Sequence, residues 1–191
     1  SLPWEPENRP QGVVPWEFET LSNSPPLDVE SLTEFLSEPH EDSAQRWLLI
    51  EPNVRDVQPS RDAVNARVTS LIHHLVAAKQ FDAGTICLAD PFDAARGLMR
   101  PDGSVDELLL PWRTAASLLG GSRYLGELQL PTGSENRVFL RRDGEVVMVV
   151  WNEREATETL YLGENIRQVD CWGRESTDMR DGDGSPIRED R

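Results

Sequence analysis

Three acidic residues stand where predicted β-strands end, and a carboxylate in such a place can serve as a nucleophile, a general acid or a general base. Glu17 lies near the end of the first predicted strand, Glu51 closes the second and Asp90 closes the third. Ligands of parallel α/β sheets and barrels bind at the carboxyl ends of the strands. Glu51 and Asp90 are therefore candidate catalytic residues, although acids at strand ends also commonly cap the loop that follows.

Tryptophan side chains offer a second kind of chemistry, because sugar rings pack well on indole faces. The chain has six tryptophans. Four of them lie inside predicted helices or strands, where core packing is the expected role. The other two, Trp4 and Trp16, lie in a proline-rich segment, and packing explains them less well. Trp16 and its neighbour Glu17 are therefore candidate substrate-binding residues.

The sequence contains no motif typical of a metal site or a cofactor-binding site. Neither Cys87 nor Cys171 has a neighbouring Cys or His at metal-ligand spacing. The sequence has no Gly-x-Ser-x-Gly motif for a serine hydrolase. The pair Gly120-Gly121 follows a predicted helix, whereas a phosphate-binding loop precedes one. We therefore expect no metal ion and no cofactor.

The charge of the chain argues against two classes of partner. Acidic residues number 34 against 19 Lys and Arg, which gives a net charge of −15. Such a chain is repelled by a phosphate backbone or an anionic membrane surface. It also lacks a run of about 18 apolar residues, so we expect a soluble protein with no nucleic-acid or membrane partner. Because Ser1 is not preceded by an initiator Met or a signal core, we expect the natural start to lie upstream, and the compartment is left open.

The first residues, 1–26, are expected to be mostly extended coil. They contain six prolines, and only 12–18 can form a strand, because proline cannot donate a hydrogen bond to a neighbouring strand. The segment 28–36 then has apolar residues at helical spacing, and Pro39 ends this predicted helix.

Strand and helix patterns alternate after that helix. Trp47–Glu51 and Gly84–Ala89 are short apolar runs typical of strands buried in a parallel sheet. Between them, Ser60 can cap a helix whose apolar stripe continues to about Gln80. The alternation predicts βαβ units and a parallel sheet over 27–121.

A second helix is predicted before the glycine pair. Ser104 and Glu107 form a capping-box pattern that would open it, and Pro111 would kink or restart it. Gly120 and Gly121 should end it.

Beyond the glycine pair the pattern changes to strands alone. The runs 137–142 and 145–151 flank Asp143-Gly144, a pair that suits the type I′ turn of a β-hairpin. Further strands are predicted at 124–130, 156–162 and 166–172. Four or five antiparallel strands without a helix predict a small β-sandwich or an open barrel over 122–191. The predicted fold class is therefore α/β plus all-β.

The order of these elements resembles the end of a TIM-barrel glycoside hydrolase. The α/β residues that carry the resemblance are Trp47-Leu-Leu-Ile-Glu51-Pro52, the strand 84–90, Pro101-Asp102-Gly103, Trp112-Arg113-Thr114 and Leu118-Leu-Gly-Gly121. Those similar to the small β-sandwich appended to such barrels are Val138-Phe139, Asp143-Gly144, Val149-Val-Trp-Asn152 and Trp172-Gly173. The resemblance covers about residues 45–185. It implies partial (β/α)8-barrel-like units followed by a small antiparallel β-sandwich.

The resemblance also implies a function. Retaining members of the group use two carboxylates ~5 Å apart, one as nucleophile and one as acid/base. The nucleophile sits at the end of the seventh strand, the place that Glu51 matches, and the acid/base belongs to the fourth strand, which would precede Ser1. About three strand-helix units cannot close an eight-stranded barrel. The chain is thus expected to be the carboxyl-terminal segment of a glycoside-hydrolase-like, carbohydrate-active protein that is not catalytically complete on its own.

Two alternatives stay open beside this interpretation. In the first, the antiparallel part is a non-catalytic module that binds a glycan or acts as a scaffold, with the α/β units as its support. In the second, an incomplete barrel acts in assembly, because its open sheet edges must pair with another chain. The expected partners are therefore a carbohydrate, and either the preceding part of the same protein or a second copy in a homo-oligomer.

Overall fold

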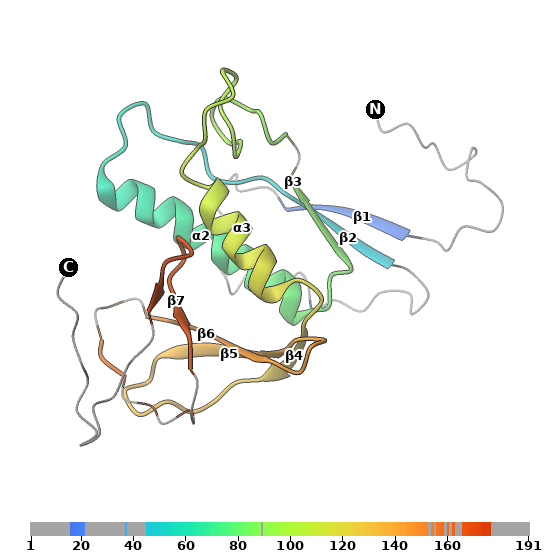
Figure 1. Ribbon diagram of the computed structural model, residues 1–191. Helices are drawn as coiled ribbons and strands as arrows, with labels where there is room; N and C mark the ends of the chain where they lie inside the picture. Colours follow the sequence, from blue (N-terminus) through green and yellow to red (C-terminus); the bar gives the residue numbers. More distant parts are fainter. Residues whose placement is uncertain are drawn as a thin grey trace.

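The computed structural model describes residues 16–21, 37, 45–88, 90–152, 154, 156–158, 160, 162 and 166–176. They form a mixed α/β fold, in which a parallel sheet and its helices are followed along the chain by two small antiparallel sheets (Figure 1). The predicted helix at 28–36, Trp4 and most of the proline-rich segment lie outside the described residues. In the described part, no helix combines the length and the apolar character needed to cross a membrane.

The parallel sheet consists of β1 (Trp16–Leu21), β2 (Gln45–Ile50) and β3 (Thr85–Leu88), in the order β1-β2-β3. Its parallel pairing confirms the prediction from the short apolar runs. The described first strand continues to Leu21, past the predicted end at residue 18, and residues 12–15 of the predicted strand lie outside the described residues. Glu17 is the second residue of β1 and pairs with Arg46. The prediction that Glu17 lies near the end of its strand is wrong, because β1 continues to Leu21.

The helix α2 (Arg61–Gln80) agrees with its prediction at both ends. The Ser60 hydroxyl accepts the N–H of Ala63 at 3.1 Å, which satisfies one of the free donors of the first turn. The apolar stripe of α2 joins Leu48 and Ile50 of β2 in one buried cluster, and both of these side chains are 0% exposed. The helix therefore covers one face of the parallel sheet.

The helix α3 (Leu109–Leu119) begins later than the capping box predicted. Ser104 and Glu107 use their side chains in other bonds, so the box does not form. Pro111 fits in the first turn, where its missing N–H costs no hydrogen bond within the helix. The predicted end is confirmed, since the N–H of Gly120 donates to the last turn at 2.9 Å.

The larger antiparallel sheet consists of β4 (Arg123–Gly126), β5 (Glu135–Leu140) and β6 (Val146–Trp151). The hairpin that joins β5 to β6 is confirmed. The type I′ turn is not, because Gly144 has a φ of 88° while Asp143 has no positive φ. Arg141 instead accepts the N–H of Gly144 at 3.1 Å and donates its own N–H to Glu145 at 2.8 Å. This longer loop needs the left-handed conformation at the glycine alone.

The last described strands, β7 (Gln168–Val169) and β8 (Glu175–Ser176), form a two-stranded antiparallel ribbon. The predicted strand at 166–172 is wrong at its end, because the Asp170 carboxylate accepts the N–H groups of Trp172 and Arg174 and closes a turn. The predicted strand at 124–130 stops at Gly126. The described residues of 156–162 lie outside any strand.

The helices α2 and α3 lie between the two larger sheets (Figure 1). On the side away from the parallel sheet, Val76 of α2 and Leu119 of α3 pack against Phe139 of β5, which is 0% exposed. The change from parallel to antiparallel strands falls between α3 and β4. The division into domains at 121–122 stays a prediction. Among the described strands, β1 and β3 each pair with β2 only, so the parallel sheet is open.

Candidate functional site

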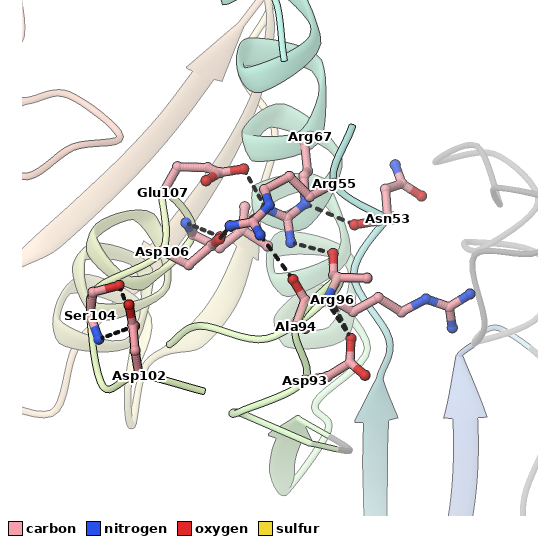
Figure 2. Close-up of polar contacts among 12 residues, drawn as sticks. Asn53, Arg55, Arg67, Asp93, Ala94, Arg96, Asp102, Ser104, Asp106 and Glu107 are labelled. Carbon is pink, nitrogen blue, oxygen red and sulfur yellow. Dashed lines mark hydrogen bonds and ion pairs between the residues drawn. The ribbon is translucent and has the colours of Figure 1, made fainter. Parts of the chain in front are cut away.

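The strands β2 and β3 lead at their carboxyl ends into two loops, 51–60 and 90–108, which form the candidate site. This edge is where parallel α/β sheets bind ligands. Figure 2 shows that Arg55 from the first loop and Arg67 from α2 converge on Asp106 of the second loop, beside the backbone that precedes Arg96. The two loops are therefore joined by side-chain bonds, and they fix one another's conformation.

Glu51 is the first residue after β2, the central strand of the sheet. Leu48 and Ile50 pack against the helices, so the alternation of a strand assigns Leu49 and Glu51 to the opposite face. The Glu51 carboxylate accepts a hydrogen bond from the Arg96 guanidinium at 2.8 Å. The side chains of Glu51 and Arg96 are 28% and 36% exposed, so solvent reaches this ion pair.

A tight loop places Arg96 beside Glu51. The Asp93 carboxylate accepts the N–H groups of Ala95 and Arg96 at 2.8 and 2.7 Å, and these two bonds lower the pKa of Asp93. The N–H of Gly97 donates to the Asp93 carbonyl at 2.9 Å. A Cβ at Gly97 would lie 2.6 Å from that carbonyl oxygen, so the approach requires glycine.

Arg67 is the buried centre of the site, with a side chain that is 5% exposed. Its guanidinium donates to four acceptors at 2.5–3.2 Å, and all four belong to the two loops. The acceptors are the carbonyls of Asn53 and Ala95 and the carboxylates of Asp106 and Glu107. A buried guanidinium is stable only when its donors are paired in this way. The pairing makes Arg67 a structural anchor for both loops.

Asp106 joins Arg67 to Arg55. Its two carboxylate oxygens each accept a guanidinium N–H at 2.8 Å, one from each arginine. Burial alone would raise the pKa of Asp106, but the hydrogen bond and charge of Arg67 outweigh burial and hold this pKa below its usual value. Asp106 is therefore a paired anion, and no proton is available from it near neutral pH.

The other predicted site residues do not lie on the face of Glu51 at the carboxyl edge. The Asp90 carboxylate accepts the N–H of Phe92 at 2.9 Å, which is the bond of a loop cap. By the alternation of β3, Asp90 belongs to the face of Ile86, the side of the helices. Trp16 and Glu17 lie at the amino end of β1, roughly 17–20 Å along the strands from the position of Glu51. The structure therefore places Glu51 and Asp90 at the same edge but on opposite faces, and Trp16 and Glu17 at the other end of the sheet.

Sequence reasoning missed Arg55, Arg67, Arg96 and Asp106. Of these four, only Arg67 could have been recognised from the sequence. It lies within the apolar stripe formed by Val64, Val68 and Leu71 of the helix, and a charged residue in an apolar stripe indicates a buried ion pair. The others lie in loops, and long-range bonds decide the conformation of those loops.

One hollow of the described surface has a volume of about 190 Å³ and lies between α2 and α3, with Leu75, Ala115 and Trp112 in its apolar wall. Gly84 and Ile86 also line it, which places it toward the amino end of β3, and Glu51 is not among its lining residues. The hollow is therefore separate from the candidate site.

No protein-family profile, no curated protein and no solved structure matches this chain. Within the described ranges, no group of three or more His, Cys, Asp or Glu side chains is arranged to hold a metal ion.

Proposed function

We propose that this chain is the carboxyl-terminal part of a glycoside-hydrolase-like, carbohydrate-active protein, with Glu51 as the nucleophile of a retaining mechanism. The observation that carries the proposal is the position of Glu51, at the carboxyl end of a central parallel strand and on the face opposite the helices. In a (β/α)8 barrel that face is the interior, and catalytic groups stand at its carboxyl rim. On this proposal, β1, β2 and β3 are three consecutive strands of such a barrel.

The proposed chemistry uses the Glu51 carboxylate in two steps. In the first, a carboxylate oxygen attacks the anomeric carbon, the bond to the leaving-group oxygen breaks, and that oxygen takes a proton from a general acid. In the second, water attacks the same carbon and releases the free carboxylate, while the acid residue recovers its proton. The family's acid belongs to another strand of the barrel, and no described carboxylate is assigned to this role. Arg96, bonded to Glu51 at 2.8 Å, would hold the attacking carboxylate in one orientation.

For the antiparallel part of the chain, we propose a β-sandwich. Phe139 and Val149 pack inward against the helices, so the alternating residues of β5 and β6 lie on the outer face. These outer residues are Val138, Leu140, Val146, Met148 and Val150. Val146 is 61% and Val150 40% exposed. An apolar face of this kind is typical of a sheet that packs against a second sheet in a β-sandwich.

The second candidate function is a non-catalytic scaffold. Trp151 lies against the ring of His73, with 5.0 Å between ring centroids, and Arg137 lies 5.1 Å from the centre of an indole ring of the same tryptophan. Trp112 and Trp172 pack against the buried cluster around β2. These three tryptophans join parts of the fold, which favours a scaffold over a glycan-binding surface among the described residues. On this alternative, Glu51→Gln changes no activity, whereas Trp151→Ala lowers the free energy of unfolding measured with urea.

The proposed partners are a carbohydrate and the chain that completes the sheet. Among the described strands, the outer edges of β1 and β3 offer backbone groups for further pairing. On the barrel proposal, these edges pair with other strands of the same protein. A homo-oligomer is the alternative, and it predicts a mass above that of one chain in light scattering.

The test uses the natural full-length translation product, assayed against a panel of aryl glycosides. We expect Glu51→Ala to lose almost all hydrolysis and to regain turnover with azide, which can attack from the space the carboxylate leaves. The glycosyl azide should have the inverted anomeric configuration. The matched control, Asp90→Ala, should keep most of its activity, because its carboxylate caps a loop. A wild-type product that hydrolyses no glycoside, or a Glu51→Ala variant as active as wild type, would contradict the proposal.

A further inference from the structure

The backbone just before Arg96 is held from across the site by Arg55 and Arg67. The Arg55 N–H donates to the Ala95 carbonyl at 2.8 Å, and its guanidinium donates to the Ala94 carbonyl at 3.0 Å. Arg67 donates to the same Ala95 carbonyl at 3.2 Å. Two consecutive carbonyls therefore receive bonds from the loop after β2 and from α2. These bonds fix the direction in which the chain enters Arg96.

Asp106 bonds both arginines and so fixes the positions of their guanidinium groups relative to each other. It bonds the Arg55 guanidinium through one carboxylate oxygen and the Arg67 guanidinium through the other. The two arginines differ in burial, since the side chain of Arg55 is 24% exposed and that of Arg67 is 5% exposed. Replacing Arg67 is therefore expected to cost more stability than replacing Arg55, which lies at the edge of the cluster.

We propose, on the basis of the proposed function, that Arg55 is a positioning residue for the nucleophile. Its guanidinium, held by Asp106, fixes the Ala94 carbonyl beside the Ala95 carbonyl that its backbone N–H bonds, and the loop then presents the Arg96 guanidinium to Glu51. The orientation of the Glu51 carboxylate is on this account set by the loop 90–108 as well as by its own strand. Arg55 acts only through Arg96 and does not contact the sugar.

The test is a double-mutant cycle on the rate of covalent labelling. The reagent is an activated 2-deoxy-2-fluoro glycoside of the sugar that wild type hydrolyses fastest. Its dinitrophenolate leaves without protonation when the Glu51 oxygen bonds the anomeric carbon, so the rate reports the nucleophile alone. The variants of the full-length protein are Arg55→Met, Arg96→Met and the double variant. The control is Arg100→Met, the same change at an exposed position of the same loop.

We expect each single variant to lower the labelling rate at saturating reagent about tenfold, with little change in the concentration that gives half the maximal rate. The double variant should be no slower than Arg96→Met alone, because Arg55 acts through Arg96. Arg100→Met should match wild type. Labelling of Arg55→Met at the wild-type rate would overturn the inference. So would a double variant slowed by the product of the two single effects.

Amide hydrogen exchange tests the positioning role of Arg55 without requiring any glycosidase activity. The N–H groups of Gly97 and Leu98 are bonded within the loop, and Arg55→Met should make them exchange faster than Arg100→Met does. If wild type is not labelled at Glu51 by any activated glycoside, the proposed function fails, and exchange still decides the positioning claim. Unchanged exchange at these amides in Arg55→Met would overturn it.

Discussion

Replacing Arg67 by Met tests whether the buried charge cluster supports the carboxyl-end loops. Methionine retains an unbranched apolar side chain and removes the guanidinium, whose donors bond four acceptors at 2.5–3.2 Å. The Ala95 carbonyl keeps the Arg55 N–H, and Asp106 keeps the Arg55 guanidinium. Breaking a buried ion pair costs about 3–5 kcal/mol. Because some partners remain, we expect a loss of about 3 kcal/mol, at the lower end of this range.

The assay for Arg67→Met is unfolding in urea, followed by fluorescence and by circular dichroism. The midpoint should fall with an unchanged slope, which indicates a change in stability without a change in the surface exposed on unfolding. The control is Arg61→Met, an exposed position in the first turn of the same helix, which should change the free energy of unfolding by less than about 0.5 kcal/mol. A loss below about 1 kcal/mol in Arg67→Met would refute the claim that the cluster anchors the loops.

Two further predictions concern Phe139 of the antiparallel sheet and the two histidines of α2. Phe139→Ala should lower the free energy of unfolding by about 3–5 kcal/mol, whereas Val146→Ala, at a 61% exposed position, should cost much less in the same urea assay. Burial holds the pKa values of His73 and His74 below the ordinary 6.5, so the unfolded chain binds more protons just below pH 6.5. The free energy of unfolding should therefore fall as the pH drops from 6.5 through the lowered values. A His73→Gln/His74→Gln variant should flatten this part of its pH profile, and an equal slope in that variant would contradict the assignment.

The elements that the sequence predicted well are those with a strong local pattern. The strand β2 contains the continuous apolar run Trp47–Ile50, and α2 combines a capping Ser60 with a regular stripe. The start of α3 was missed for a physical reason. Ser104 and Glu107 match a capping box locally, but Glu107 pairs with the distant Arg67 and Ser104 bonds within its own turn. Tertiary bonds therefore override the local capping signal.

The candidate site was predictable only in part. The place of Glu51 follows from the rule that a residue after a parallel strand lies at the carboxyl edge, and the structure agrees with that placement. Its partner Arg96 lies 45 positions further along the chain, in a loop with no periodic pattern. Asp106 meets arginines 39 and 51 positions away. Such pairs depend on how the loops pack, and a single sequence does not encode that packing in any local signal.

The most direct test of the account is the mass of one tryptic peptide after labelling. Cleavage after Arg46 and Arg55 gives the peptide Trp47–Arg55, in which Glu51 is the only acidic side chain. After full-length protein is treated with the activated fluoroglycoside, the account predicts that this peptide gains the mass of one fluoroglycosyl group. It also predicts that the gain is absent in Glu51→Gln. A fluoroglycosyl group found on a different peptide, with Trp47–Arg55 unmodified, would contradict the assignment of Glu51 as the nucleophile.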